Sequence, residues 1–251
     1  MKKLSLLLAV CLLVGILAGC GEIAPEKITI GGIEYSTSLT NLELDTKGLK
    51  PSDIEQLKYM KQLTLLVLSC NEISDISALS GLTNLKCLRL SGNNINITPL
   101  TKLTNLEDLY LRYNQMNDIS VLSKLTNLKR LDLSGNSISD ISALKDLTNL
   151  ETLNLEYNVN NIKDLSDISS LSNLTNLKEL YLGDNSISDI SALKELTNLT
   201  FLSLNRNKIS DVSVLKGLTN LETLALAGNV INDAQKAELR AALPKCKIAF
   251  N

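Results

Sequence analysis

The chain repeats one pattern of apolar residues from about Ser36 to its C-terminal end. The clearest copy, residues 125–146, reads LTNLKRLDLSGNSISDISALKD. In it, Leu131 and Leu133 are separated by one polar residue, which is the pattern of a short strand with one buried face. After Asn136 the apolar residues are spaced by three, as in a tight 3₁₀ segment. Each repeat is therefore predicted to contain a strand, a bend and a return segment.

One repeat cannot form a stable structure by itself. Its few apolar side chains bury too little surface to offset the conformational entropy lost on ordering about 22 residues. Stacking removes this difficulty, because strand hydrogen bonds and core contacts then run from one repeat to the next. The repeats therefore predict a single elongated solenoid.

An asparagine follows the strand in nearly every repeat. The series is Asn71, Asn93, Asn114, Asn136, Asn158, Asn185, Asn207 and Asn229, while Lys47 takes this place in the degenerate first repeat. A side-chain amide both donates and accepts hydrogen bonds, so it can satisfy backbone groups that a bend leaves without partners. We expect these residues to form a ladder inside the stack.

The motif LxxLxLxxNxI, followed by SDIS and a leucine, resembles the leucine-rich repeats of bacterial internalin-like surface proteins over about residues 36–251. The resemblance implies an α/β repeat fold, a right-handed leucine-rich-repeat solenoid. Parallel strands would line its concave face, and 3₁₀ or irregular segments its convex face. The family keeps this frame and varies its partners, so the resemblance implies a binding protein without naming what it binds.

The N-terminus has the pattern of an export signal. A positively charged start is followed by a nearly continuous apolar run over residues 4–17, which is too short to span a membrane comfortably. The run ends in LAGC, which resembles a bacterial lipobox and implies a signal peptide over 1–19, a lipid on Cys20 and a short tether over 20–27. The alternative is an ordinary cleaved signal with a chance cysteine. We expect an extracytoplasmic protein, anchored by lipid to the bacterial cell membrane.

Both ends of the repeat region, 36–231, have sequences suited to caps. Residues 28–35 alternate around a Gly-Gly turn and predict a hairpin. Residues 232–251 begin with a helical pattern that Asn232 or Asp233 can cap. The chain is therefore expected to be one domain with an N-terminal hairpin cap and a C-terminal helical cap.

One repeat carries an insertion at residues 159–164. It directly follows the strand, so it is expected to lie at the rim beside the concave face. Such loops often carry function. A tolerated surface insertion explains it equally well.

Composition excludes several kinds of function. The chain has no His, the commonest general base and a frequent metal ligand. Without its two N-terminal lysines it has 23 basic and 27 acidic side chains, a net charge of −4. No basic stripe is present, so nucleic acid is not an expected partner. Cys70, Cys87 and Cys246 are expected to be free, packed thiols, and no cofactor or metal site is predicted.

An aspartate recurs on the return segment, at Asp75, Asp118, Asp140, Asp167, Asp189 and Asp211. One interpretation is a ladder of carboxylates that binds cations. The other is that each Asp, with the serine after it, caps a 3₁₀ turn. No glycine-containing calcium loop accompanies these residues, so capping is favoured.

Strand residues that alternate with the buried leucines point outward and form the concave face. The candidate partner-binding residues there are Tyr110, Arg112, Tyr113, Arg130, Asp132, Asn154, Glu156, Tyr157, Tyr181, Asp184, Phe201, Asn205 and Arg206. Five of the eight aromatic residues of the chain belong to this set. Strand propensity alone favours Tyr and Phe, but it does not explain their concentration in the middle repeats. We therefore predict a binding face with aromatic and arginine anchors.

Catalysis is not predicted. Carboxylates such as Asp132 and Glu156 could flank a glycosidic bond, but an open sheet offers no pocket to raise one pKa or to exclude water. The chain is interpreted as a monomeric recognition module for a protein, such as one on a host or neighbouring cell. The alternatives are binding of a cell-envelope glycan and a purely structural role in the envelope.

Overall fold

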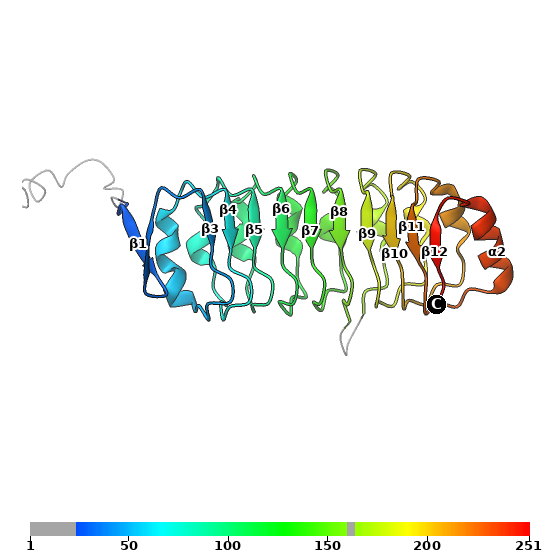
Figure 1. Ribbon diagram of the computed structural model, residues 1–251, viewed down its shortest axis with the longest axis horizontal. Coiled ribbons are helices and arrows are strands. Elements are labelled where there is room, and N and C mark those ends of the chain that lie inside the picture. Colours follow the sequence, from blue (N-terminus) through cyan, green and yellow to red (C-terminus); the bar gives the residue numbers. More distant parts are fainter. Residues whose placement is uncertain (1–23, 160–163) are drawn as a thin grey trace, which may run out of the picture.

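The computed structural model describes residues 24–159 and 164–251 as an elongated solenoid (Figure 1). Its main sheet has ten parallel strands of three residues each, and neighbouring strands pair in chain order. The strands are β3 (Asn41–Glu43), β4 (Leu65–Val67), β5 (Cys87–Arg89), β6 (Asp108–Tyr110), β7 (Arg130–Asp132), β8 (Thr152–Asn154), β9 (Glu179–Tyr181), β10 (Phe201–Ser203), β11 (Thr223–Ala225) and β12 (Lys247–Ala249). The predicted repeat solenoid is confirmed.

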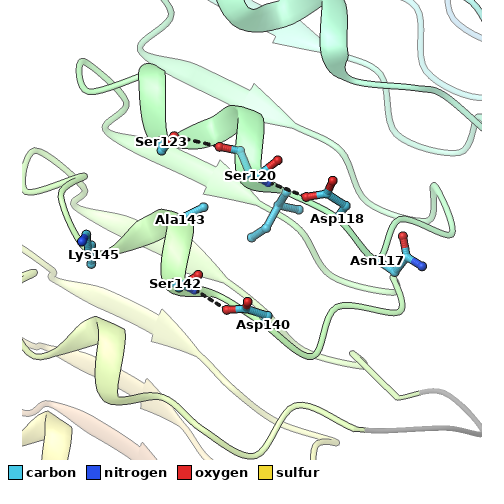
Figure 2. Close-up of a pocket in the computed structure, with 9 residues that line it drawn as sticks. Asn117, Asp118, Ser120, Ser123, Asp140, Ser142, Ala143 and Lys145 are labelled. Atoms are coloured by element: carbon cyan, nitrogen blue, oxygen red, sulfur yellow. Dashed lines mark hydrogen bonds between the residues drawn. The ribbon is translucent and has the colours of Figure 1, made fainter.

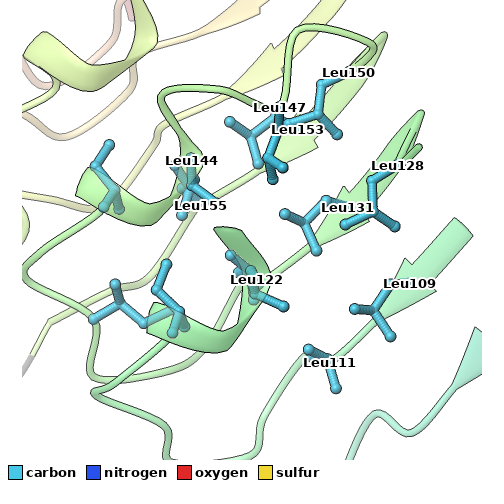
Figure 3. Close-up of a cluster of buried hydrophobic side chains, with 14 of the residues drawn as sticks. Leu109, Leu111, Leu122, Leu128, Leu131, Leu144, Leu147, Leu150, Leu153 and Leu155 are labelled. Atoms are coloured by element: carbon cyan, nitrogen blue, oxygen red, sulfur yellow. The ribbon is translucent and has the colours of Figure 1, made fainter. Parts of the chain in front are cut away.

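The return segments form short 3₁₀ helices behind the sheet, as the spacing of three predicted. They are η1 (Pro51–Tyr59), η2 (Ser77–Leu79), η3 (Thr98–Lys102), η4 (Ser120–Lys124), η5 (Ser142–Leu144), η6 (Ser169–Leu171), η7 (Ser191–Leu193) and η8 (Ser213–Gly217). Figure 3 shows Leu131 of β7 in the core that Leu122 of η4 and Leu144 of η5 also enter. All three side chains are at most 1% exposed, so a continuous aliphatic core runs between sheet and 3₁₀ helices.

The predicted asparagine ladder is confirmed. Asn136 is 3% exposed, and its Nδ2 donates to the carbonyls of Leu133, at 2.9 Å, and of Leu111 in the preceding repeat, at 3.1 Å. Its Oδ1 accepts the backbone N–H groups of Asn114 and Met116, each at 3.0 Å. Each amide thus links two repeats through backbone groups that would otherwise be buried without partners.

The short repeat at residues 82–102 disturbs this ladder. Asn114 donates normally, to Leu111 and to Leu90 of the short repeat, each at 3.0 Å. Its buried Oδ1, however, has no partner among the described residues, although the equivalent oxygen of Asn136 has two. One missing residue therefore coincides with one unpaired acceptor in the interior.

A second asparagine row, which the sequence reasoning missed, lies at the opposite end of the strands. It consists of Asn84, Asn105, Asn127, Asn149, Asn176, Asn198 and Asn220, and each Nδ2 donates to a backbone carbonyl of the preceding repeat. These residues are exposed, unlike the buried ladder. The recurring LTNL could have indicated the row, since its Asn is as regular as the leucines.

Both expected caps are present. β1 (Lys27–Ile30) and β2 (Ile33–Ser36) form an antiparallel hairpin, and φ is positive at Gly31 and Gly32, as a two-residue turn of this kind requires. At the other end lies α2 (Asp233–Ala242), whose N-cap is Asn232. The side chain of Asn232 accepts the N–H of Gln235, and Gln235 accepts the N–H of Asn232 in return.

Several predictions concern residues outside the described ranges. The export signal, the lipid site at Cys20 and residues 160–163 of the insertion all lie there. Across 24–159 and 164–251, no helix is both long and apolar enough to cross a membrane. The targeting and anchoring of the chain therefore stay predictions.

The cysteine prediction needs one correction. Cys87 and Cys246 are partly buried thiols, but Cys70 is exposed rather than packed. It occupies the bend directly before Asn71, where the backbone has a positive φ of 55°. This conformation turns its side chain to the rim, beside Gly92 of the next repeat, where an added Cβ would lie 3.3 Å from the Cys70 Sγ.

Candidate concave binding face

Four outward positions per repeat form the concave face. In the β7 repeat, the first and third strand residues are Arg130 and Asp132. The other two positions, Ser134 and Gly135, directly follow Leu133. Because neighbouring strands pair in register, each position continues as a row across the sheet. We call the row that contains Gly135, directly before the ladder asparagines, the bend row.

The bend row requires a left-handed backbone. Its members are Thr46, Cys70, Gly92, Tyr113, Gly135, Tyr157, Asp184, Arg206 and Gly228, and their φ angles run from 52° to 71°. Glycine adopts this conformation freely, whereas other residues carry a cost of roughly 1–2 kcal/mol. The middle repeats nevertheless place two tyrosines, an aspartate and an arginine there. The sequence analysis missed this strain, although three repeats place glycine directly before the ladder asparagine, which indicates a left-handed backbone at that position.

Side chains of the bend row lie against the next repeat. The ring of Tyr113 covers Gly135, where an added Cβ would come within 2.1 Å of a ring carbon. The negative charge of Asp184 raises the pKa of Tyr157, and the Arg206 Nη1 lies 3.2 Å from an Asp184 carboxylate oxygen. Tyr113 and Tyr157 remain 53% and 44% exposed, so the row is an accessible rim.

Strands β5 and β6 carry what we call the basic platform: Arg89, Tyr110, Arg112 and Tyr113. The guanidinium carbon of Arg89 lies 5.0 Å from the centre of the Tyr110 ring, and that of Arg112 lies 4.6 Å from the Tyr113 ring. Arg112 also donates to the Tyr113 hydroxyl, at 3.0 Å, and this hydrogen bond raises the pKa of Arg112. The rings therefore position both cations at the surface.

Strands β8 to β10 carry the acidic platform: Glu156, Glu179, Tyr181 and Phe201. The Tyr181 and Phe201 rings lie 4.7 Å apart, at an interplanar angle of 32°. Tyr181 donates to Glu179 at 3.2 Å, and burial followed by the charges of Glu179 and Glu156 raises the pKa of Tyr181. Two carboxylates thus flank a pair of partly buried rings.

Glu156 is held by a contact that spans two repeats. Its Oε1 accepts a hydrogen bond from the hydroxyl of Ser203, at 2.7 Å. Gly183 lies between them, and a Cβ there would approach the same carboxylate oxygen to 2.8 Å. A glycine just after β9, in the intervening repeat, therefore leaves the space that this carboxylate occupies.

The thirteen predicted site residues all lie on this face, but they divide by role. Asp132, Asn154 and Asn205 each accept a backbone N–H in the loop that follows or in the next repeat. Arg130 pairs with Asp108 at 2.7 Å, and Arg206 pairs with Asp184. The tyrosines, Phe201, Arg112 and Glu156 form the two platforms and the rim. Contact of any of them with a partner stays a prediction.

The recurring aspartates cap turns, as favoured from the sequence. The Oδ1 atoms of Asp118 and Asp140 accept the N–H groups of Ser120 and Ser142, each at 2.8 Å, and line the hollow between η4 and η5 (Figure 2). A similar hollow includes Asp167 and Asp189. These hollows recur with the repeat, so stacking accounts for them. In the part of the chain that the structure describes, no group of three or more Cys, Asp or Glu residues is placed to hold a metal ion.

Family models match most of the repeat region. A model described as leucine-rich repeats (2 copies) matches residues 104–146, 126–170, 148–195 and 197–239. A second model, leucine-rich repeat, matches residues 37–95. No protein with a curated description matches the chain by sequence.

Solved structures give the same family. Internalin C2 of Listeria monocytogenes is 32% identical, with a TM-score of 0.70 over 79% of this chain and 85% of that one. The internalin InlF of the same species is 28% identical, with a TM-score of 0.59 over 88% and 77%.

A plant structure extends the likeness beyond bacteria. The leucine-rich repeat ectodomain of the Arabidopsis thaliana receptor kinase GASSHO1/SCHENGEN3, solved in complex with Casparian strip integrity factor 2, is 27% identical. Its TM-score is 0.62 over 76% of this chain and 24% of that one. From these matches, the chain belongs to the leucine-rich repeat family and is internalin-like.

Proposed function

We propose that the chain is a non-enzymatic recognition module, anchored at the cell surface, that binds another protein through the concave face of β5 to β10. The observation that carries the proposal is the concentration of aromatic and charged side chains on these strands. The next strand, β11, presents only Thr223, Ala225, Ala227 and Gly228 on the same face. A face that served only the fold would not need this difference.

The chemistry of the face suits a protein partner. Tyr and Arg supply large contact areas and directional hydrogen bonds, and they are frequent among residues that dominate binding energy. The exposed tyrosines of the bend row stand beside charged groups that can select a partner. By resemblance to the internalins, a protein on a host or neighbouring cell is the partner we favour, bound by a monomer.

Catalysis would need groups that the face does not bring together. Asp132 accepts two hydrogen bonds from Ser134, and Glu156 accepts one from Ser203. Both carboxylates lie on an open sheet and are partly exposed. They are therefore better suited to contacting charged groups of a partner than to acid–base chemistry.

The binding proposal is tested by capture from solubilised host-cell and envelope extracts with the purified chain. We expect selective retention of a protein, and loss of that protein when Tyr157 and Tyr181 are both changed to Ala. Thr223→Ala is the matched control, because it alters the same face outside the platforms. Retention on isolated peptidoglycan without protein capture would support the glycan alternative, since tyrosine rings also stack on sugars.

The anchoring proposal rests on the LAGC sequence at residues 17–20. A lipid on Cys20 would hold the solenoid close to the membrane, because only a few residues separate Cys20 from the hairpin. Cys20→Ser should block processing or release the protein from the membrane fraction. If the variant partitions into detergent as the parent does, the chain is not anchored in this way.

A further inference from the structure

The charges of the concave face are separated along the solenoid. Arg89, on β5, and Arg112, which follows β6, have no salt-bridge partner among the described residues. Glu156, which follows β8, and Glu179, on β9, likewise form no salt bridge in that part of the chain. Asp132 on β7 lies between the two groups. Between β5 and β9, the concave charges without a salt bridge are therefore positive at the β5 end and negative at the β9 end, whereas Arg130 and Asp108 neutralise each other.

Outside the two platforms the chain pairs charges between neighbouring repeats. Just before the strands, Glu107 lies 3.3 Å from Lys86 and 2.7 Å from Lys129, and Glu151 lies 2.7 Å from Lys178. There, acids and bases alternate from repeat to repeat and neutralise each other. The concave platforms lack this alternation, so their charges remain available to another molecule.

We propose that the partner is a protein segment with an acidic group for the basic platform and a basic group for the acidic platform. This inference rests on the proposed function and adds the chemistry and direction of the partner. An arginine held against a ring keeps N–H groups free for a carboxylate, which it can bind in a bidentate manner. A ring pair beside carboxylates suits an ammonium or guanidinium group, which gains ion-pair and cation–π attraction together.

The sheet sets the spacing between the two groups. Arg112 follows β6 and Glu179 lies on β9, three strand intervals away, and in the register of the sheet Arg112 lies four residues further along the strand direction than Glu179. Three intervals of about 4.8 Å and four residues of about 3.3 Å place the acidic and basic groups of the partner about 19 Å apart. In an extended segment this corresponds to about six residues, at roughly 3.3–3.6 Å each.

Parts of both platforms are already in place before any partner binds. Tyr113 fixes Arg112 through a hydrogen bond and ring contact, and Ser203 fixes Glu156 across Gly183. Ordering a side chain on binding costs free energy, so groups held in advance bind more tightly. The face therefore presents two prepared, oppositely charged sites.

The test uses synthetic peptides of nine residues as probes, titrated into the full chain and followed by NMR. The mixed peptide has Glu at position 2 and Arg at position 8, and matched peptides carry Glu at both or Arg at both positions. We expect the mixed peptide to bind at least about tenfold more tightly than either control, the effect of one favourable charged contact. Equal affinities, or no measurable binding at millimolar concentration, would overturn the proposal.

Charge reversal identifies the sites. The variant Arg112→Glu should no longer favour probes that contain Glu. The variant Glu179→Arg should no longer favour probes that contain Arg. Arg112→Gln and Glu179→Gln provide a second pair in case reversal disturbs folding. Lys102→Glu, on η3 outside the face, should not change binding. If Lys102→Glu weakens the mixed peptide as much as Arg112→Glu does, net charge rather than the platforms selects the probe.

Two outcomes separate this inference from the proposed function. If capture of a protein depends on Tyr157 and Tyr181 but tolerates both charge reversals, the concave face remains the proposed binding site and the proposed charge pattern of the partner is wrong. Two copies of the chain, arranged antiparallel, would also match opposite charges. Analytical ultracentrifugation tests this alternative. If the parent sediments as a dimer, Arg112→Glu as a monomer, and a mixture of Arg112→Glu with Glu179→Arg as a dimer again, the face serves self-association and the proposal is overturned.

Discussion

Strands β9 and β11 have the same interior and different exteriors. Leu180 and Leu224 are both fully buried, and each strand pairs in parallel with its neighbours. Outward, β9 carries Glu179 and Tyr181, whereas β11 carries Thr223 and an alanine. The difference indicates that the outward side chains are not needed to build a repeat. The buried leucines specify the repeat fold, whereas the outward side chains can vary with what the protein binds.

The interior should therefore be equally intolerant in both regions. Leu131→Ala in the middle and Leu224→Ala near the end each remove a fully packed side chain, and we expect losses of about 2–5 kcal/mol in the free energy of unfolding. Denaturant unfolding followed by circular dichroism measures both. A loss below about 1 kcal/mol at Leu224 would mean that the terminal repeats do not share the middle core.

The asparagine ladder should show a graded response. Asn136→Ala leaves the N–H groups of Asn114 and Met116 without their acceptor, at a cost of about 1–3 kcal/mol, while the carbonyls of Leu111 and Leu133 keep a second asparagine donor. Asn229 is only half-buried, so Asn229→Ala should cost less because water can replace part of its contacts. Thermal melting compares the two variants. If Asn136→Ala melts like the parent, the ladder does not stabilise the stack.

At the bend row, replacing a tyrosine by glycine should affect stability and partner binding in opposite directions. Tyr157 has a positive φ of 57°, where glycine is favoured. Tyr157→Gly should therefore leave the protein as stable as the parent or up to about 1 kcal/mol more stable, while partner capture falls. Gly228→Tyr, at the equivalent end position, should destabilise without creating binding. A clear loss of stability in Tyr157→Gly would show that this tyrosine serves the fold.

The smallest effect concerns pH and arises from carboxylates outside the binding face. Hydrogen bonds from Lys129 and Lys86 lower the pKa of Glu107, and the backbone N–H of Ser120 lowers that of Asp118. A carboxyl with a lower pKa in the folded chain adds stability above its unfolded pKa and loses it as pH falls through the folded pKa. Stability should decline below about pH 5, and Glu107→Gln should make the decline shallower. An unchanged slope would assign the acid sensitivity to other groups.

Much of the frame could be predicted from the sequence. Leu131, Leu133 and Asn136 recur in one register, and their periodicity determines strand, bend and core together. The caps were equally legible, because a Gly-Gly turn and the asparagine before a helical pattern have few alternatives. Regular, local and repeated signals translate directly into structure.

The candidate binding face could be predicted only in part from the sequence, for a physical reason. Periodicity shows that Tyr110 and Glu156 face outward, but not which neighbour each side chain contacts. The contact of Glu156 with Ser203 depends on a glycine in the intervening repeat, and the exposure of Cys70 depends on a left-handed bend. Such features arise from side-chain geometry between repeats, which a pattern within one repeat does not contain.

The central claim, that the middle of the sheet is the binding face, is tested most directly by the double variant Tyr157→Ala, Tyr181→Ala measured beside Thr223→Ala. Partner affinity and melting temperature are determined for both proteins by titration calorimetry and thermal unfolding. We predict that the double variant loses more than about 1–2 kcal/mol of binding free energy with a nearly unchanged melting temperature, while Thr223→Ala binds as the parent does. Full affinity in the double variant, or an equal loss in Thr223→Ala, would contradict the account.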